Sequence, residues 1–281
     1  MRSTGLFTVK NYIIKIKELG EPIYLLPFAD VHKFAPLHAA EKWRDFLEWA
    51  RNKERAYFIG LGDYVDLASS SERNSIKTGK FHESTLMTLE ELYIKHINDF
   101  HKDIEFMSGR CIGLMEGNHY AEFRDGTTST QQLCRLVKCN YLGVSAFIRL
   151  SIRWKGMSSK IDIWAHHGKG AARLIGGSLN TVKQMGEQAE ADIYLMAHDH
   201  KKSVGMTSRL RLTDSRGNIS LSHRKQIYAR CGSFLRGYVP DEVSYVADGN
   251  LNTTDMGIVK IELTPQRKHQ ESLSIDIHAS I

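Results

Sequence analysis

Five short clusters of histidine, aspartate and asparagine contain the side chains of this chain that could do chemistry. They are Asp30-Val31-His32, Gly62-Asp63-Tyr64-Val65-Asp66, Gly117-Asn118-His119, His166-His167-Gly168 and His198-Asp199-His200. Carboxylate, imidazole and amide groups suit borderline divalent cations such as manganese, iron, zinc or nickel, whereas a cage of cysteine thiolates forms a closed structural site. No cysteine stands in these clusters, so they favour an open, catalytic metal site.

The number of candidate ligands exceeds what one open catalytic ion requires. They divide well between two cations that share a bridging carboxylate. Two such ions, about 3.5 to 4 Å apart, clamp a phosphate ester for in-line attack, lower the pKa of a shared water and offset the charge that develops on the phosphoryl oxygens. We therefore expect two divalent metal ions and hydrolysis of phosphate esters, with manganese as the expected cofactor and iron, zinc or nickel as alternatives.

Each cluster by itself has an ordinary structural explanation. An Asp-x-His sequence occurs by chance, Gly-Asp and Gly-Asn form turns, and a histidine pair can simply be hydrogen-bonded in a loop. Their joint occurrence is harder to explain in this way, because burying so many polar groups together is costly unless something compensates. Bound metal ions would supply that compensation.

The elements that must position the clusters are short apolar runs, each read as a buried strand that ends where a cluster begins. These runs are residues 23–28, 56–61, 111–115, 161–165 and 193–197, with helix-like segments at 38–54, 83–107, 128–137 and 179–190 between them. The alternation predicts an α/β layout with a largely parallel central sheet. Since the carboxyl ends of parallel strands share one edge, where α/β proteins place their ligands, all five clusters can converge on one crevice.

The pattern changes after residue 203. Strand-like runs at 225–230, 257–263 and 272–278 follow one another without helices, and they predict a second, partly antiparallel sheet. We expect a single domain over residues 1–281, with a basic, β-rich segment at about 201–238.

His119 is a candidate general acid, because a histidine beside the metal ligand Asn118 could protonate the leaving oxygen. Asp66 is its natural partner, since a carboxylate would fix the tautomer of the imidazole. The alternative is that His119 is a structural histidine outside the site.

The clusters, in this order, resemble the motif set of calcineurin-like metallophosphoesterases. The resemblance implies a four-layer α/β sandwich in which two mixed β-sheets are flanked by helices, the metallo-dependent phosphatase fold. It implies that one metal is held by Asp30, His32, Asp63 and His200, and the other by Asp63, Asn118, His167 and His198, with Asp63 bridging. His119 and Asp66 would form the acid pair. The choice between His166 and His167 stays open, with His167 favoured because a ligand histidine before glycine is the form seen in phosphatases of this superfamily.

Departures from the family pattern bear on the substrate. Protein serine/threonine phosphatases continue the second motif with a phosphate-binding Arg-Gly, whereas Leu67-Ala68 follows here, which argues against that activity. Tyr120 replaces an acidic residue after the third motif; its phenol could contact a substrate or merely pack. The loop that contains Lys169 and Arg173 could receive phosphate through backbone N–H groups, or could be only a lid.

The excess positive charge of the chain sits in one stretch. Between Asp199 and Arg236 nine basic residues stand against two acidic ones, a net +7 compared with +6 for the whole chain. The nine are Lys201, Lys202, Arg209, Arg211, Arg216, Arg224, Lys225, Arg230 and Arg236. The stretch could track a nucleic-acid backbone, or it could be an ordinary solvated face.

A nuclease acting on DNA or RNA is therefore the leading hypothesis. Arg209, Arg211 and Arg224 would contact the phosphates, and Tyr228, Phe234 or Tyr238 could stack on bases. The runner-up is a phosphoesterase for small molecules such as cyclic nucleotides. A non-catalytic scaffold is the third hypothesis, and it is disfavoured because every expected ligand and His119 are present.

Targeting features are absent from the sequence. No apolar stretch approaches the roughly 20 residues of a membrane-spanning helix, and residues 1–17 lack the apolar core of a signal peptide. We expect a cytoplasmic protein with no membrane partner. The sequence leaves the oligomeric state open, a homodimer included.

Overall fold

The structure, a computed structural model, contains two six-stranded sheets. It describes residues 8–170, 172–215, 217–241, 244–250, 252–253, 255–269 and 272–281. Arg216, one of the nine basic residues of the charged stretch, lies outside the described residues.

Sheet A has the strand order β1-β6-β7-β8-β10-β9. Its strands are β1 (Thr8–Lys15), β6 (Ser145–Trp154), β7 (Met157–His166), β8 (Ile193–Met196), β9 (Lys202–Ser215) and β10 (Asn218–Cys231). Strands β7, β8 and β10 run parallel, whereas β6 pairs with β7 and β9 with β10 in antiparallel fashion. The sheet is therefore mixed, and a long β9–β10 hairpin forms one of its edges.

Sheet B has the strand order β12-β11-β2-β3-β4-β5. Its strands are β2 (Ile23–Phe28), β3 (Ala56–Gly60), β4 (Cys111–Leu114), β5 (Asn140–Tyr141), β11 (Lys260–His269) and β12 (Ser272–Ser280). Strands β2 to β5 are parallel, and β11 pairs antiparallel with both β2 and β12. Strand β4, between β3 and the edge strand β5, is buried throughout, which explains its continuous apolar sequence.

The helices are α1 (Ala40–Arg51), α2 (Ser70–Thr78), α3 (Glu83–Ile104), the 3-10 turn η1 (Glu105–Met107), α4 (Ser129–Val137), α5 (Ile175–Gln188) and the short α6 (Tyr245–Asp248). Capping boxes begin two of them. Ser69 accepts the backbone N–H of Glu72 at the start of α2, and Thr128 accepts that of Gln131 at the start of α4. These side chains satisfy N–H groups that would otherwise lack partners at the helix ends.

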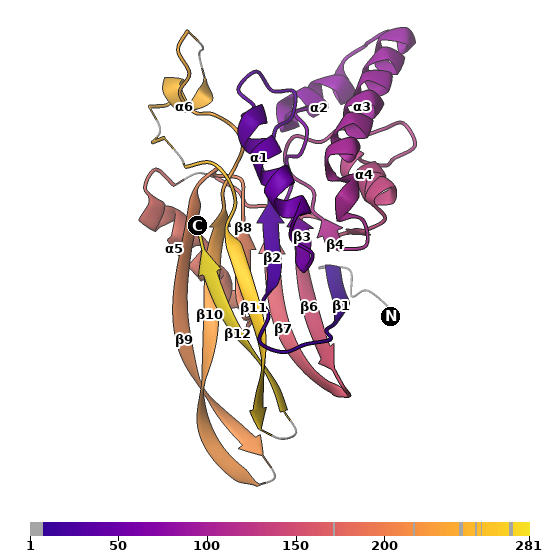
Figure 1. Cartoon of the computed structure of the whole chain (residues 1–281). Helices are drawn as coiled ribbons and strands as arrows, with labels where there is room; N and C mark the ends of the chain where they lie inside the picture. The colour runs from indigo at the N-terminus through magenta and orange to yellow at the C-terminus, as the bar shows by residue number, and fades with distance from the viewer. Residues whose placement is uncertain are drawn as a thin grey trace.

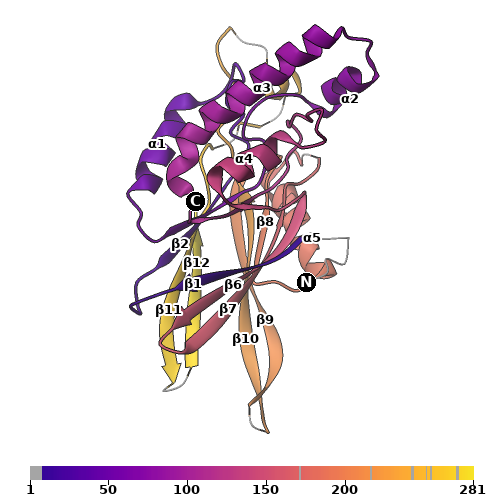
Figure 2. The same ribbon diagram turned by 90° about the vertical axis from the view of Figure 1, so that its right-hand side faces the viewer.

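Three clusters of buried apolar side chains define the layers (Figures 1 and 2). The largest lies between the two sheets and includes Leu25, Ile163 and Ile261. The second lies between sheet B and helices α1, α3 and α4, and the third between sheet A and α5. The predicted α/β sandwich of two mixed sheets flanked by helices is therefore confirmed.

Two details of the sequence-based layout are wrong. The five strands that precede the polar clusters do not share one central sheet, because β2, β3 and β4 belong to sheet B whereas β7 and β8 belong to sheet A. The later strands do not form a sheet of their own either: β9 and β10 extend sheet A, and β11 and β12 extend sheet B. Apolar periodicity shows that a strand is buried, but not which sheet it joins.

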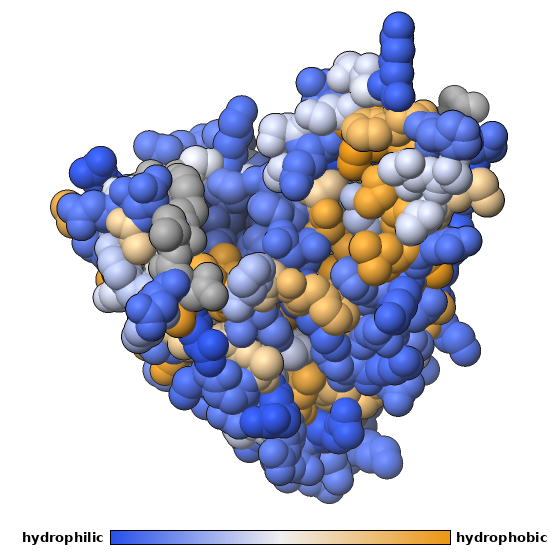
Figure 3. All heavy atoms as spheres, turned by 90° about the horizontal axis from the view of Figure 1, so that it is seen from above, coloured by the Kyte–Doolittle hydropathy of each residue, from blue (hydrophilic) through white to orange (hydrophobic). Residues whose placement is uncertain are grey.

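Helix α3 packs on sheet B only through its C-terminal half, where Ile97, Phe100 and Ile104 are buried. Towards its N-terminus Met87 and Leu92 are exposed, and so is Phe81, just before the helix. Seen from above, a hydrophobic area of the surface lies beside a polar region (Figure 3). Among the described residues no helix has both the length and the apolar character needed to cross a bilayer.

Candidate metal centre

The five polar clusters meet at one end of the two sheets. Asp30 and His32 follow β2, Asp63 follows β3, and Asn118 follows β4, all in sheet B. His167 follows β7, and His198 and His200 follow β8, in sheet A. The clusters therefore converge as predicted, although three of them follow strands of sheet B and two follow strands of sheet A.

The backbone at these loops is unusual. Five of the seven candidate ligands adopt a positive φ: Asp30 at 47°, His32 at 46°, Asp63 at 53°, His198 at 75° and His200 at 59°. Residues other than glycine seldom do so, and aspartate, asparagine and histidine do so most readily. Such strain persists only where the surroundings impose it, and it clusters at functional sites.

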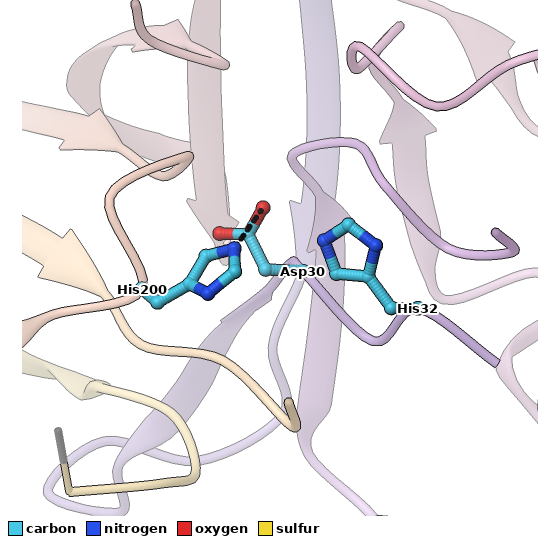
Figure 4. A group of neighbouring side chains, drawn as sticks. All are labelled: Asp30, His32 and His200. Atoms are coloured by element: carbon cyan, nitrogen blue, oxygen red, sulfur yellow. Dashed lines mark ion pairs between the residues drawn. The ribbon is translucent and has the colours of Figure 1, made fainter. Parts of the chain in front are cut away.

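Asp30, His32 and His200 form the first triad. One ligand atom from each lies within 4.8 Å of the others. Figure 4 shows the Asp30 carboxylate between the two imidazole rings, with Nε2 of His200 3.9 Å from Oδ1 of Asp30. The other carboxylate oxygen, Oδ2, accepts the backbone N–H of His198 at 2.9 Å. Oδ1 is therefore the oxygen that faces the triad.

Asp63, His167 and His198 form the second triad. Oδ2 of Asp63 lies 3.4 Å from Nε2 of His167 and 3.8 Å from Nε2 of His32, so it reaches both triads. Oδ1 of Asp63 instead accepts the backbone N–H groups of Asn118 and His119, at 2.5 and 2.8 Å. The Asn118 amide lies 2.9 Å from Nδ1 of His198. Asp63 is thus placed where a bridging carboxylate would have to be.

Buried side-chain atoms without a hydrogen-bond partner indicate whether the oxygen and nitrogen atoms of the two triads fit a cation. Among the described residues, six buried side-chain atoms lack a hydrogen-bond partner, and three of them belong to the triads. These three are Oδ1 of Asp30, Nε2 of His32 and Nε2 of His167. Leaving such groups unsatisfied is costly, and divalent cations bound in the two triads would satisfy all three. The residues present therefore fit metal ions held by oxygen and imidazole nitrogen.

The protonation states of Asp30 and His200 favour the same interpretation, whereas that of His167 opposes metal binding. Burial raises the pKa of the Asp30 carboxyl to about 7, so a nearby cation is needed to keep it fully ionised at neutral pH. Burial lowers the pKa of His200 to about 3, which leaves its imidazole in the neutral form that binds metals. Burial also acts to lower the pKa of His167, but the carboxylates of Asp63 and Asp30 outweigh it and raise that pKa to about 9. Metal binding would have to displace this proton.

The structure distinguishes the two adjacent histidines. His167 is buried, its Nδ1 lies 2.7 Å from the carbonyl oxygen of Leu61, and its Nε2 faces Asp63. His166 is outside both triads, and its Nδ1 accepts the backbone N–H of Gly168 at 2.7 Å. His167 is therefore the one that enters the candidate centre.

His119 and Asp66 form a close pair beside the triads. Nδ1 of His119 lies 2.6 Å from Oδ1 of Asp66, and Asp66 also lies 3.6 Å from Nδ1 of His32. The hydrogen bond to Asp66 raises the pKa of His119, and the same contact lowers the pKa of Asp66. The imidazole is thus held in one orientation, with Nε2 as the ring nitrogen that Asp66 does not engage.

Glycine at position 117 is a steric requirement of the site. A Cβ atom there would lie 2.0 Å from Oδ1 and 2.3 Å from the backbone nitrogen of Asp63. The backbone nitrogen cannot move aside without disturbing the left-handed conformation of Asp63. The close approach explains why a Gly-Asn-His motif is needed here.

We expect Gly117→Ala to lower the free energy of unfolding by about 1–3 kcal/mol, because the added methyl overpacks the site. Manganese binding, measured by calorimetry, should weaken as Asp63 is displaced. Gly176→Ala in α5 is the matched control, since a Cβ there meets nothing within 4 Å. Equal stability and equal manganese binding in the two variants would contradict this steric argument.

A cavity of about 480 Å³ opens beside the triads. His32, Asp63, His119, His198 and His200 line it on one side, and Gly170, Arg173 and Asn252 on another. The side-chain amide of Asn252 donates to the carbonyl oxygen of Arg173 at 3.2 Å, which ties the two loops together. Arg173 is therefore placed where a substrate could meet it.

Two further predicted substrate contacts lie beside this cavity. Lys169 is exposed but is not among the residues that line it. Tyr120 lines a smaller pocket with Asp63 and His119; its ring lies under the Arg73 guanidinium at 3.7 Å, and its hydroxyl donates to Glu122. The packing alternative for Tyr120 is the one that its contacts favour.

The structure does not bring Arg209, Arg211 and Arg224 to the site, contrary to their prediction as substrate contacts. They lie on one face of the β9–β10 hairpin, and Arg209 is seven residues, roughly 23 Å, from the start of β9. They face carboxylates near α5: Arg209 meets Glu187, Arg211 meets Glu190, and Arg224 meets Glu190 and Asp192. Their charge is therefore largely neutralised.

Two of the proposed base-stacking residues are unavailable for that role. Tyr228 is 3% exposed and stacks on Tyr194, and Phe234 is 1% exposed and packs against Trp43. Tyr238 is 46% exposed. The sequence around these three aromatic residues does not indicate which of them are buried and which are exposed.

Arg73 is a site residue that the sequence motifs did not indicate. It lies in α2, and its Nη1 donates to the carbonyl oxygens of Ala68, Asn118 and Tyr120 at 2.6, 2.5 and 3.1 Å. It therefore ties the loop after Asp66 to the loop that carries His119. No local pattern around Arg73 could have revealed these long-range contacts.

Comparisons with known proteins give the following findings. No protein-family model matches the chain, and no curated protein matches it. Its structure is similar to Vps29 from Chaetomium thermophilum, with a TM-score of 0.37, 10% identity, and coverage of 92% of this chain and 97% of that one. A predicted phosphoesterase from Streptococcus pneumoniae gives a TM-score of 0.35 at 10% identity, with coverage of 92% and 99%.

A calcineurin-like phosphoesterase, YfkN from Bacillus subtilis, gives a TM-score of 0.28 at 10% identity, with coverage of 92% of this chain and 90% of that one. All three similarities are at 10% identity with TM-scores below 0.4. The residues whose motifs resemble those of calcineurin-like metallophosphoesterases converge in the structure, from Asp30 in the first motif to His200 in the last.

Proposed function

We propose that this chain is a metal-dependent phosphoesterase of the calcineurin-like superfamily, with two divalent cations, manganese foremost. The observation that carries the proposal is the pair of adjacent triads, with Oδ2 of Asp63 within 3.8 Å of His32 in the first and 3.4 Å of His167 in the second, next to the His119–Asp66 pair and beside one cavity. When bound, two such cations supply hydroxide at neutral pH and offset charge on the phosphoryl group.

The residues of the chain would divide the remaining work. Asp30, His32, Asp63 and His200 would hold one cation, and Asp63, Asn118, His167 and His198 the other. His119 would deliver a proton from Nε2 to the leaving oxygen, while Asp66 keeps Nδ1 protonated and the ring oriented. Arg173, at the cavity, would bind a phosphate oxygen of the substrate.

The pH dependence of hydrolysis tests the His119–Asp66 pair. The pKa of His119 is raised by Asp66, so the imidazolium persists to higher pH than in a free histidine, and the acid is lost as pH rises through that pKa. Asp66→Asn removes the charge that raises it. We expect the alkaline limb of the kcat/KM profile to move to lower pH in this variant. If the alkaline limb does not move in Asp66→Asn, a group other than His119 produces that limb.

Nucleic acid is the substrate class that we propose first. The chain carries a net charge of +6, and Arg173 and the exposed Lys169 lie at or near the cavity. One observation favours the second candidate, a small-molecule phosphodiester or phosphomonoester. The guanidinium groups of Arg209, Arg211 and Arg224 are engaged in ion pairs, so they do not form a long basic track for a nucleic-acid backbone.

Hydrolysis of single-stranded and duplex DNA and of RNA, with manganese and at increasing salt, separates the two candidates. A nuclease should lose affinity steeply with salt, by a slope of about 0.7–0.9 per phosphate contact, and Lys169→Glu with Arg173→Glu should flatten that slope. Arg209→Glu with Arg211→Glu is the matched control. If nucleic acid stays intact at low salt while bis(4-nitrophenyl) phosphate or 4-nitrophenyl phosphate is cleaved, the small-molecule candidate replaces the nuclease.

A further inference from the structure

A fully buried arginine lies beneath the loop that carries His198 and His200. Arg230, in β10, is 1% exposed, and the side chain of Asp199, between the two histidines, is fully buried. Nε of Arg230 lies 3.5 Å from Oδ2 of Asp199. Arginine and aspartate are almost never buried to this extent unless they are paired. Neither residue belongs to the candidate ligands or to the acid pair.

The contacts of this pair converge on the backbone of the metal loop. Arg230 donates from Nη1 to the carbonyl oxygen of Ala197 at 2.7 Å, and from Nε to that of Ser178 at 3.1 Å. The Ser178 hydroxyl donates to Oδ2 of Asp199, and the backbone N–H of Lys201 points at Oδ1 from 3.3 Å. The loop is thus held at its beginning, its middle and its end.

The loop needs such support because of its conformation. His198 and His200, on either side of Asp199, both have a positive φ, at 75° and 59°. Such a backbone conformation is strained and persists only when the surroundings over-determine it. The Arg230–Asp199 pair supplies contacts to the peptide group that precedes His198 and to the one that follows His200.

Stability alone does not explain the pair. Taking two charges out of water is expensive, and apolar side chains of similar volume often replace a buried ion pair without loss of stability. Apolar side chains form no hydrogen bonds, however, so they cannot fix the positions of the carbonyl and carboxylate groups in the loop. A role in positioning therefore explains the network better than a role in stability.

We propose that Arg230 and Asp199 are positioning residues that hold His198 and His200 in the geometry needed to bind cations, one histidine in each triad. The inference rests on the proposed function, since it presupposes that the triads bind metal. Because Ser178 lies in the first turn of α5, the network also anchors the helix that follows the loop containing Arg173.

The test uses a double variant, Arg230→Met with Asp199→Asn, which removes both charges so that neither is left buried and unpaired. Its metal-free form should melt within about 5 °C of the parent. Calorimetric titration with manganese should show affinity about 10–100-fold weaker, as is typical when partners behind metal ligands are lost. The matched control, Arg224→Met with Asp192→Asn, removes an ion pair between β10 and the residue that precedes β8, away from the loop, and should leave manganese affinity unchanged.

Arg230→Lys provides a second variant in case the double variant does not fold. It keeps the charge but lacks the planar guanidinium that reaches Ala197 and Ser178 together, so its manganese affinity should also fall. Parent affinity in either folded variant would overturn the positioning role while leaving the proposed function intact. A parent protein that binds no manganese would instead overturn the proposed function, and the positioning role with it.

Discussion

His119→Ala is expected to lower turnover on an unactivated phosphodiester by about 10²–10⁴-fold, the range that a positioned general acid contributes. The loss arises because the leaving alkoxide would have no proton donor. On bis(4-nitrophenyl) phosphate the loss should be much smaller, since nitrophenolate leaves without protonation. Steady-state rates on the two substrates, measured with the same manganese-loaded preparation, check this expectation.

The control for His119→Ala is a variant at a histidine outside the site. His278 is exposed on β12, and His278→Ala should change neither rate nor manganese binding. Manganese affinity should also survive in His119→Ala, because His119 is not a ligand in either proposed set. An equal loss of rate on both diesters would remove His119 from the acid role and point to a defect in metal binding.

Asp63→Asn is expected to abolish most of the thermal stabilisation that bound manganese gives to the folded protein. For the parent, an ion at 100 times its Kd contributes about 2.7 kcal/mol per site, which corresponds to a rise in Tm of roughly 5–10 °C for a chain of this size. The variant keeps the shape of the side chain but loses the negative charge that lies within 4 Å of a histidine in each triad. We expect its manganese-induced rise in Tm to fall below about 2 °C, with hydrolysis at least 10²-fold slower.

Thermal melts with and without manganese, together with the metal content of the loaded protein, measure this effect. Asp45→Asn, on the exposed face of α1, is the matched control and should keep the whole rise in Tm. If Asp63→Asn binds two ions per chain and gains the parent's stabilisation, Asp63 does not bridge the two sites.

The sequence predicted the class of the fold and the meeting of the polar clusters, but not which sheet each strand joins. The ligands could be located because each stands directly after a buried apolar run, and the end of such a run lies at the edge of a sheet. Strand β2 begins and ends where its apolar run does, and α4 begins after the capping residue Thr128. These features depend on neighbours along the chain.

What the sequence could not predict depends on contacts between distant segments. Strands β1 and β6 are exceptions, because their alternation of polar and apolar residues is itself a local sign of a half-buried strand, although it forms no continuous apolar run. The partners of Arg209, Arg211 and Arg224 come from α5 and the loop that follows it, so the net charge of the basic stretch overstated the charge that is free to bind a polyanion. Net charge counts residues but does not show which of them are paired.

Each triad draws its members from both sheets. Asp30 and His32 come from loops of sheet B and meet His200 from sheet A, whereas Asp63 from sheet B meets His167 and His198 from sheet A. A cation bound in either triad would therefore act as a cross-link between the halves of the sandwich. Any sliding of one half against the other, even one that starts in the apolar interior far from the loops, would pull the ligands out of register.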